Sequence, residues 1–443
     1  MSIDPTTETR TGTATGTGTG TEPSTAAVTG SAGAARPEVR SADQAIDPVG
    51  RPQAGIVLTG LAVGVLLGAV IALHAGTTTA VLYVIGLALG FVLFHSRFGF
   101  TSAWRQLMAV RQGTGLRAHM LMLAVACTLF APILATGASL GATAPTASLA
   151  PIGFGVVVGA FLFGVGMQIG GACASGTLFA VGSGQSAIVL TLGGFVVGSV
   201  LGAWTFGWWA QLPSFGSVSL AGTGLGYLGG WLISLAMIAA VVAVTLVVER
   251  RRPGVPALDR PPHARGAARA LRGSWPLWVG ALLLAGLNAL TLLVSGAPWG
   301  ITSAFALWGS KLLGAVGVDV TSWSYWADRL ASYRAGVLGD TTSVMDLGII
   351  VGALVAAAAA GTWTFRRRIP ARLALGAVLG GILMGYSARI AFGCNIGAYF
   401  AGIASFSLHG WLWGAMALLG TIVGLRLRPL FGLGNPKPGD SVC

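Results

Sequence analysis

Charged side chains are scarce in this chain of 443 residues, and acidic ones are the scarcest. Only 9% of the residues are Asp, Glu, Lys or Arg, whereas 54% are hydrophobic. Soluble domains carry about 25% charged residues, so this composition excludes an ordinary soluble fold. We expect an all-α integral membrane protein, because long apolar runs are typical of membrane-spanning helices rather than of a β-barrel.

The acidic residues also avoid the apolar part of the chain. We place Glu249 and Asp346 only at the ends of predicted spans, so no carboxylate is expected deep in the membrane. Six of the thirteen acidic residues lie in the first 50 positions, namely Asp4, Glu8, Glu22, Glu38, Asp43 and Asp47. This distribution argues against a cation path or a carboxylate proton relay. It predicts passive uptake with no obligatory ion gradient.

Cysteine is equally rare, with four residues and no CxxC or Cys/His cluster: Cys127, Cys173, Cys394 and Cys443. Such spacing supports neither a disulfide framework nor a metal site. We therefore expect no metal and no cofactor. Cys127 lies in a smooth apolar run and is expected to be an ordinary buried side chain, and Cys443 is expected to be an exposed tail residue.

The net charge of +13 would suggest a nucleic-acid partner in a soluble protein. Here the arginines cluster beside apolar runs, as in cytoplasmic loops that follow the positive-inside rule, so we expect the lipid bilayer and no nucleic acid as a partner. The arginine-rich segments are 97–117, 249–274, 366–372 and 426–428. Placing all of them in the cytoplasm puts both termini there as well.

About ten spans of roughly 20 residues fit the apolar pattern. They are predicted at 55–75, 80–96, 118–137, 152–170, 187–206, 226–248, 275–295, 346–365, 372–388 and 408–425. The predicted organisation is a disordered cytoplasmic tail (1–50), a first membrane half (51–248), a cytoplasmic linker (249–274), a second half (275–430) and a C-terminal tail (431–443). Because spans one to five and six to ten correspond, and five is odd, the two halves should have inverted topology.

Two glycine-rich segments interrupt the apolar spans and resemble each other. Gly164–Gly184 contains Cys173, and Gly385–Trp411 contains Cys394. When the cysteines are aligned, Gln168 and Arg389 each precede their cysteine by five residues. Weaker copies without cysteine lie at 99–104 and 300–305. Broken backbone is tolerated at membrane depth only inside protein or beside a watery cavity, so we expect four short re-entrant or broken helices that line a transport path.

These elements favour an anion as the transported species. Ends of broken helices present N–H donors, Arg389 adds positive charge, and no acid is expected nearby. The polarisable cysteine sulfur suits a sulfur-bearing ion. The candidate path residues are Gln168, Gly171, Cys173, Ser175, Thr177, Arg389, Gly393, Cys394 and Asn395, with Ser102 and Ser303 from the weaker copies. Trp323, Tyr325, Trp326 and Tyr333 suggest an external amphipathic segment lying on the membrane.

The segments Gly166–Leu178, Ala388–Gly397 and Ser407–Trp411 resemble the YeeE/YedE sulfur-transport family. The resemblance implies a bacterial inner-membrane protein with an hourglass of helices. It implies uptake of thiosulfate or a related sulfur compound past pore cysteines at Cys173 and Cys394. Family members often carry a further cysteine in the N-terminal element, where this chain has Phe100.

Two other functions remain open from the sequence. The chain could carry another soft anion, such as a selenium compound or sulfite. It could instead be a membrane sulfur relay in which a cysteine carries a persulfide, although no His or acidic residue stands near either cysteine to activate a thiolate. An enzyme is not expected, and a cytoplasmic sulfur-carrier or sulfurtransferase protein is a candidate partner.

Overall fold

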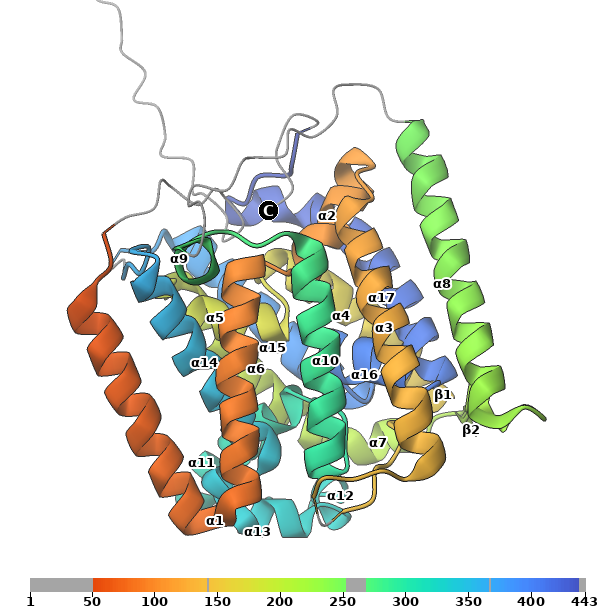
Figure 1. Ribbon diagram of the computed structural model, residues 1–443, viewed down its shortest axis with the longest axis horizontal. Helices are drawn as coiled ribbons and strands as arrows, with labels where there is room; N and C mark the ends of the chain where they lie inside the picture. Colours follow the sequence, from red (N-terminus) through yellow and green to blue (C-terminus); the bar gives the residue numbers. More distant parts are fainter. Residues whose placement is uncertain (1–50, 142, 252–267, 366–367, 438–443) are drawn as a thin grey trace, which may run out of the picture. The chain divides into compact units, whose positions relative to one another are not determined.

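In the computed structural model, the residues described are 51–141, 143–251, 268–365 and 368–437. The predicted tail 1–50, most of the linker 249–274 and Cys443 lie outside them. The described chain is mostly helical and contains almost no strand (Figure 1), which confirms the all-α membrane class. Among the described residues, nine helices are long and apolar enough to cross a membrane.

The first part of the chain runs from α1 to α8. Its helices are α1 (Ala54–Ser96), α2 (Phe100–Val110), α3 (Thr114–Thr136), α4 (Phe154–Ile169), α5 (Ala174–Gly182), α6 (Ser186–Trp204), α7 (Phe206–Ala210) and α8 (Gly226–Arg250), with a short 3₁₀ turn η1 (Leu220–Gly222). Strands β1 (Pro151–Gly153) and β2 (Ser214–Ser217) form a small antiparallel pair between these helices.

The second part runs from α9 to the last described turn. Its elements are α9 (Ala268–Arg272), α10 (Leu277–Ser295), α11 (Thr302–Ala315), α12 (Ser324–Ala327), α13 (Leu330–Gly339), α14 (Thr341–Ala359), α15 (Ala371–Ile390), the π-helical turn η2 (Asn395–Phe400), α16 (Ala401–Ala404), α17 (Leu408–Leu427) and η3 (Arg428–Phe431). The four predicted broken elements correspond to α2, α5, α11 and η2 with α16.

Helix α1 bends back on itself at Gly76. Its 43 residues would extend about 65 Å as a straight helix, roughly twice the hydrocarbon thickness of a bilayer. Gly76 has φ 83° and ψ 172°, a conformation that glycine adopts without steric cost. The bend divides α1 into two spans near the predicted 55–75 and 80–96, so the nine long helices provide ten crossings.

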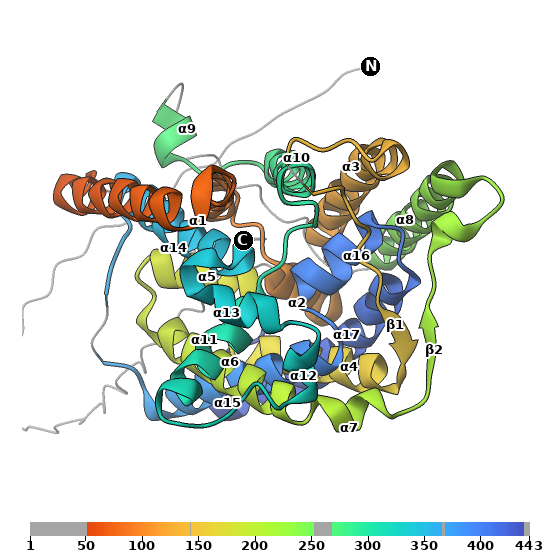
Figure 2. The ribbon, with the colours of Figure 1, turned by 90° about the horizontal axis from the view of Figure 1, so that it is seen from below.

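The packing of the helices repeats across the two parts of the chain. The contact of α1 with α14 corresponds to the contact of α10 with α3. In the same way, the contact of α6 with α15 corresponds to the contact of α17 with α4. The first part of α1 contacts α14 where Gly60 meets Val355, and α8 contacts α3 in the matching way. Figure 2 shows α1 beside α14 and α3 beside α8. From these pairings we infer that α8 begins the second repeat, although the domain division above places it in the first half.

The matching helices run in opposite directions. In Figure 1, α3 descends whereas α14 ascends, and α10 descends whereas the second part of α1 ascends. The beginning of α1, the end of α8 and the end of α17 lie on one face of the bundle. This arrangement agrees with two inverted repeats of five spans, each containing two broken elements.

Helix α14 corrects two expectations. It begins at Thr341 rather than near 346, because the Asp340 side chain caps it by accepting a hydrogen bond from the Ser343 N–H at 2.8 Å. Asp346 is therefore inside the helix and is fully buried (0% exposed), not at a span end. Asp346 is thus a buried carboxylate inside a segment long and apolar enough to cross a membrane, contrary to the expectation from the sequence.

Candidate functional site

Cys173 stands at the break between α4 and α5. Its backbone is extended, and its carbonyl accepts hydrogen bonds from the N–H and the hydroxyl of Thr177, at 2.7 and 2.8 Å. Its thiol lies 3.5 Å from the hydroxyl of Ser175 and is 1% exposed. Thr177 therefore fixes the turn, and Ser175 supplies a hydroxyl beside the sulfur.

Cys394 stands at the equivalent break between α15 and η2. The N–H of Ile396 donates to its sulfur at 3.4 Å, and its carbonyl accepts from the N–H groups of Ala398 and Tyr399. The bond to Tyr399 spans five residues and makes η2 a π-helical turn, a distortion that is frequent at functional sites. Cys394 is completely buried.

The backbone turns before both cysteines share one feature and differ in another, because Gly393 also has positive φ whereas Ala172 does not. The residue two positions before each cysteine has positive φ, 87° at Gly171 and 56° at Phe392. Both cysteines then adopt extended conformations and begin a short helix. Positive φ is unusual for a bulky residue, and such strain gathers at functional sites. The repeat is thus preserved in the backbone even where glycine is replaced by phenylalanine.

We expect the substitution Gly393→Ala to strain and distort this turn. Gly393 has φ 142°, and a Cβ there would lie 2.7 Å from the backbone nitrogen of Ala398, so alanine should cost about 1–3 kcal/mol of strain. Gly397→Ala is the matched control, because a Cβ at Gly397 meets nothing within 4 Å. Uptake in proteoliposomes and thermal unfolding of both variants check this, and equal behaviour of the two would contradict it.

The two breaks meet in the interior of the protein. Helix α5 packs against η2, so the two short helices that begin at the cysteines lie side by side. The Cys394 thiol is within electrostatic range of both Cys173 and Arg389. The structure thus brings together three of the predicted path residues, from the two repeats.

Arg389 is buried next to this centre with no acidic partner among the residues that the structure describes. It is 6% exposed, and its guanidinium donates to the hydroxyls of Tyr325 and Thr302. Both partners are neutral, and the Tyr325 ring lies 5.5 Å from the guanidinium carbon. A buried charge without a counter-charge is costly, so an anion near Arg389 would be stabilised there.

The segment that supplies Tyr325 does not lie on the membrane as an external amphipathic helix. Tyr325 and Trp326 of α12 are 4% and 2% exposed, and the Trp326 indole donates to the hydroxyl of Ser310 at 3.1 Å. Sequence reasoning missed Tyr325 and Thr302 as partners of Arg389. Thr302 lies in a copy of the repeated motif, which was a usable signal, whereas Tyr325 is 64 residues from Arg389 and gave none.

The other predicted residues divide into two groups. The side-chain amide of Gln168 donates to the carbonyl of Thr101 at 3.2 Å. The Ser102 hydroxyl donates to the carbonyl of Gly99 at 3.1 Å. Both side chains therefore lie at the start of α2, near Cys173. Ser303 is exposed and its hydroxyl donates to Thr342 at 3.0 Å. The structure therefore does not place Ser303 with the cysteines.

Asn395 is the most unusual polar side chain of the centre. It is completely buried, and neither its amide oxygen nor its amide nitrogen has a hydrogen-bond partner in the described structure. The hydroxyl of Thr101 and the amide oxygen of Gln168 are also buried without a partner. Buried polar groups are almost always hydrogen-bonded, so these atoms are available to a polar ligand.

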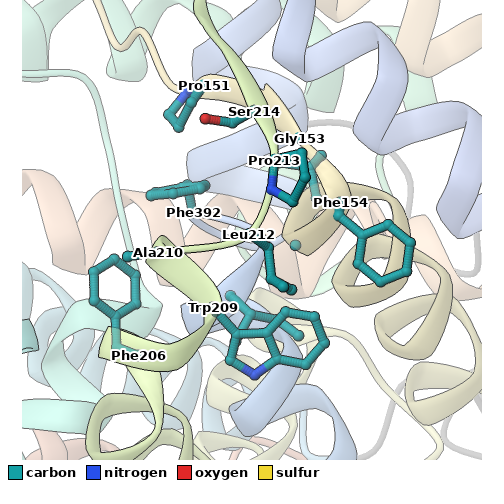
Figure 3. Close-up of a pocket in the computed structure, with 13 residues that line it drawn as sticks. Pro151, Gly153, Phe154, Phe206, Trp209, Ala210, Leu212, Pro213, Ser214 and Phe392 are labelled. Atoms are coloured by element: carbon teal, nitrogen blue, oxygen red, sulfur yellow. The ribbon is translucent and has the colours of Figure 1, made fainter.

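Two recesses approach the centre. A cavity of about 180 Å³ is lined by Phe154, Phe206, Trp209, Leu212, Pro213, Ile390 and Phe392 among others (Figure 3). It lies beside α7, β1 and β2 and reaches Phe392, two residues before Cys394. A much smaller recess, of about 20 Å³, lies between the start of α2 and the start of α5 and is lined by Thr101, Ser102, Gly171 and Cys173. The smaller recess therefore reaches Cys173 itself, and the larger one reaches the turn that precedes Cys394.

Comparison with known protein families matches a family described as sulphur transport over residues 95–423. The chain belongs to this family. The match includes both cysteine breaks and most of both repeats. It places the protein among multi-pass membrane transporters and supports the expectation that it is not an enzyme.

Individual relatives agree with this family. The chain is 27% identical over 353 residues to the thiosulfate transporter TsuA of Spirochaeta thermophila, a match covering 76% of this chain and 94% of the relative. It is 28% identical over 344 residues to TsuA of Escherichia coli, covering 76% and 90%. It is 34% identical over 140 residues to the probable transporter YedE of Escherichia coli, and that match covers 31% of this chain and only 34% of the relative.

Proposed function

We propose that this protein takes up thiosulfate, or a closely related sulfur-containing anion, across the bacterial inner membrane, with both termini in the cytoplasm. The path runs from the larger recess past Phe392 and Arg389 to Cys394 and Asn395. It then passes Cys173 to the recess at α2. The observation that carries the proposal is the pair of cysteines that begin short helices at equivalent breaks of inverted repeats and meet in the interior.

The chemistry of this path fits a dianion with a terminal sulfur. Arg389 supplies a positive charge that has no acidic partner within the described part of the chain. Asn395 and the two thiols supply donors and polarisable atoms, and none of the three forms a salt bridge with the residues that the structure describes. Both cysteines are buried in this conformation, so passage requires the Phe392 turn and the starts of the short helices to move.

The cytoplasmic end needs a sink or a driving force. A dianion moving against an inside-negative potential of 100 mV faces ~4.6 kcal/mol, at ~2.3 per charge. A cytoplasmic sulfur-carrier or sulfurtransferase protein that consumes the ion stays a prediction.

Asn395→Leu separates the role of this side chain in transport from any role in folding. Leucine has a similar volume and removes two unpartnered buried polar groups, so stability should be unchanged or increase by about 1 kcal/mol. Uptake of labelled thiosulfate should nevertheless fall at least about tenfold, because a donor to the anion is lost. Normal uptake by the stable variant would remove Asn395 from the path.

The direct test of the proposed function is uptake of ³⁵S-thiosulfate into proteoliposomes that contain the purified full chain. Uptake should exceed that of protein-free vesicles and should be suppressed by unlabelled thiosulfate. Selenosulfate and sulfite, offered as competitors, distinguish the sulfur anion from other soft anions. Failure of thiosulfate to enter, with one of these entering instead, would reassign the substrate.

A further inference from the structure

The carboxyl group of Asp346 is a second unusual feature of the membrane interior. It is 0% exposed, and neither of its oxygens has a hydrogen-bond partner among the described residues. An ionised carboxylate without a cation or donors is among the least favourable groups inside a membrane protein. An acid in such a place marks a candidate functional site, since an apolar residue of similar size would pack at lower cost.

The position of Asp346 relates it to the cysteine centre. It lies on the same face of α14 as Ile350 and Ala353, four and seven residues later, and these contact Gly182 of α5. One turn earlier, Ser343 accepts a hydrogen bond from the indole of Trp308 in α11. Asp346 therefore faces the region between α5 and α11, two of the four broken elements.

No basic group forms a hydrogen bond or ion pair with Asp346 in the described structure. The other titratable or charged side chains on the elements packed around α14 are His74, Tyr83 and His95 on α1, Lys311 on α11, Tyr333 and Arg334 on α13, and Arg269 and Arg272 on α9, whereas α5 has none. Lys311 instead stacks on the ring of Tyr333 at 4.2 Å. The acidic group next to Asp346 along this part of the chain is Asp340, the cap of α14.

We propose that Asp346 is a proton-binding site that couples uptake of the anion to uptake of protons. This inference rests on the proposed function and adds its driving force. In each cycle an external proton forms an O–H bond on the Asp346 carboxylate, and that bond breaks when the proton leaves to the cytoplasm. No redox step is involved. Each proton carried with a dianion cancels one of its charges.

A proton fits the site better than a metal cation does. A metal cation needs several oxygen ligands around it. The described residues contain no group of three or more His, Cys, Asp and Glu side chains that could hold one. A single carboxyl group is, by contrast, sufficient for a proton.

The experiment measures coupling in proteoliposomes that contain the full chain, with the potential clamped near zero by potassium and valinomycin. With the external pH one unit below the internal pH, the unaltered protein should accumulate ³⁵S-thiosulfate up to about tenfold above the external concentration for each proton carried. Thiosulfate should also acidify the vesicle interior, as reported by trapped pyranine.

Asp346→Asn keeps the shape of the neutral acid but cannot exchange a proton. It should let labelled thiosulfate equilibrate without accumulation and without acidification. Asp328→Asn, at an exposed position, is the control and should accumulate normally. The acidification measured with the unaltered protein tests the proposal even if the Asn variant fails to fold.

The outcomes separate this proposal from the proposed function. Equilibration of thiosulfate to the external level, regardless of the pH gradient, overturns proton coupling and leaves thiosulfate transport intact. Accumulation driven only by a sodium gradient also overturns it. No thiosulfate uptake under any gradient overturns the proposed function and proton coupling together.

Discussion

Replacing Cys394 by alanine should reduce thiosulfate uptake by roughly tenfold to a hundredfold, the effect expected when a buried polar contact to the ion is left unsatisfied. Cys394 is fully buried, begins the π-helical turn and lies in electrostatic range of both Arg389 and Cys173. Alanine is compatible with the extended conformation of Cys394, and it removes the hydrogen bond from the Ile396 N–H to the sulfur. Cys173→Ala should behave in the same way, since it occupies the equivalent break.

Cys127→Ala is the matched control for these variants. Cys127 is also completely buried, but its thiol donates to the carbonyl of Ile403 at 3.5 Å and joins α3 to α16. Its loss should lower the free energy of unfolding by about 1 kcal/mol and leave uptake unchanged. If all three variants are monodisperse and transport equally well, the thiols have no role in the path.

Replacing Arg389 by glutamine should weaken the apparent affinity for thiosulfate at least about tenfold, because it removes a buried positive charge beside Cys394. Gln168 occupies the equivalent position in the first repeat, so glutamine is compatible with this break. The Arg389 guanidinium also joins α15 to α11 and α12 through Thr302 and Tyr325, which predicts a parallel loss of stability.

Two further variants separate the charge of Arg389 from its structural contacts. Tyr325→Phe removes one hydrogen bond and keeps the charge, so it should lower stability with little change in apparent affinity. Arg389→Lys keeps the charge and should retain more affinity than Arg389→Gln. Thermal unfolding and concentration-dependent uptake distinguish the two roles. Unchanged affinity in folded Arg389→Gln would show that the arginine is only structural.

Much of the fold could be predicted from the sequence, because apolar length and glycine placement are local signals. The spans at 372–388 and 408–425 agree closely with α15 and α17. The start of α14 is not evident from the sequence, because Asp340 and Ser343 at its first turn are polar and interrupt the apolar pattern. The resulting shift of five residues made Asp346 look like a residue at a span end.

The candidate site was predictable where it repeats and not where it depends on tertiary packing. The two cysteine breaks and the role of Arg389 were predictable because two segments of the same chain can be aligned. Tyr325 reaches Arg389 only because α12 folds inward, and Ser303 is exposed although its motif matches that of Ser102. Whether a side chain faces the path depends on how the helices pack, and this packing cannot be derived from composition or from residue spacing.

We propose that the thiols at the two breaks let a sulfur anion pass. The most direct measurement is ³⁵S-thiosulfate uptake into proteoliposomes, with a tenfold excess of unlabelled sulfate or unlabelled thiosulfate outside. We expect strong suppression by thiosulfate and little by sulfate, which lacks the terminal sulfur, and loss of uptake in the Cys173→Ala and Cys394→Ala variants. Equal suppression by both anions, or uptake that does not depend on these cysteines, would contradict it.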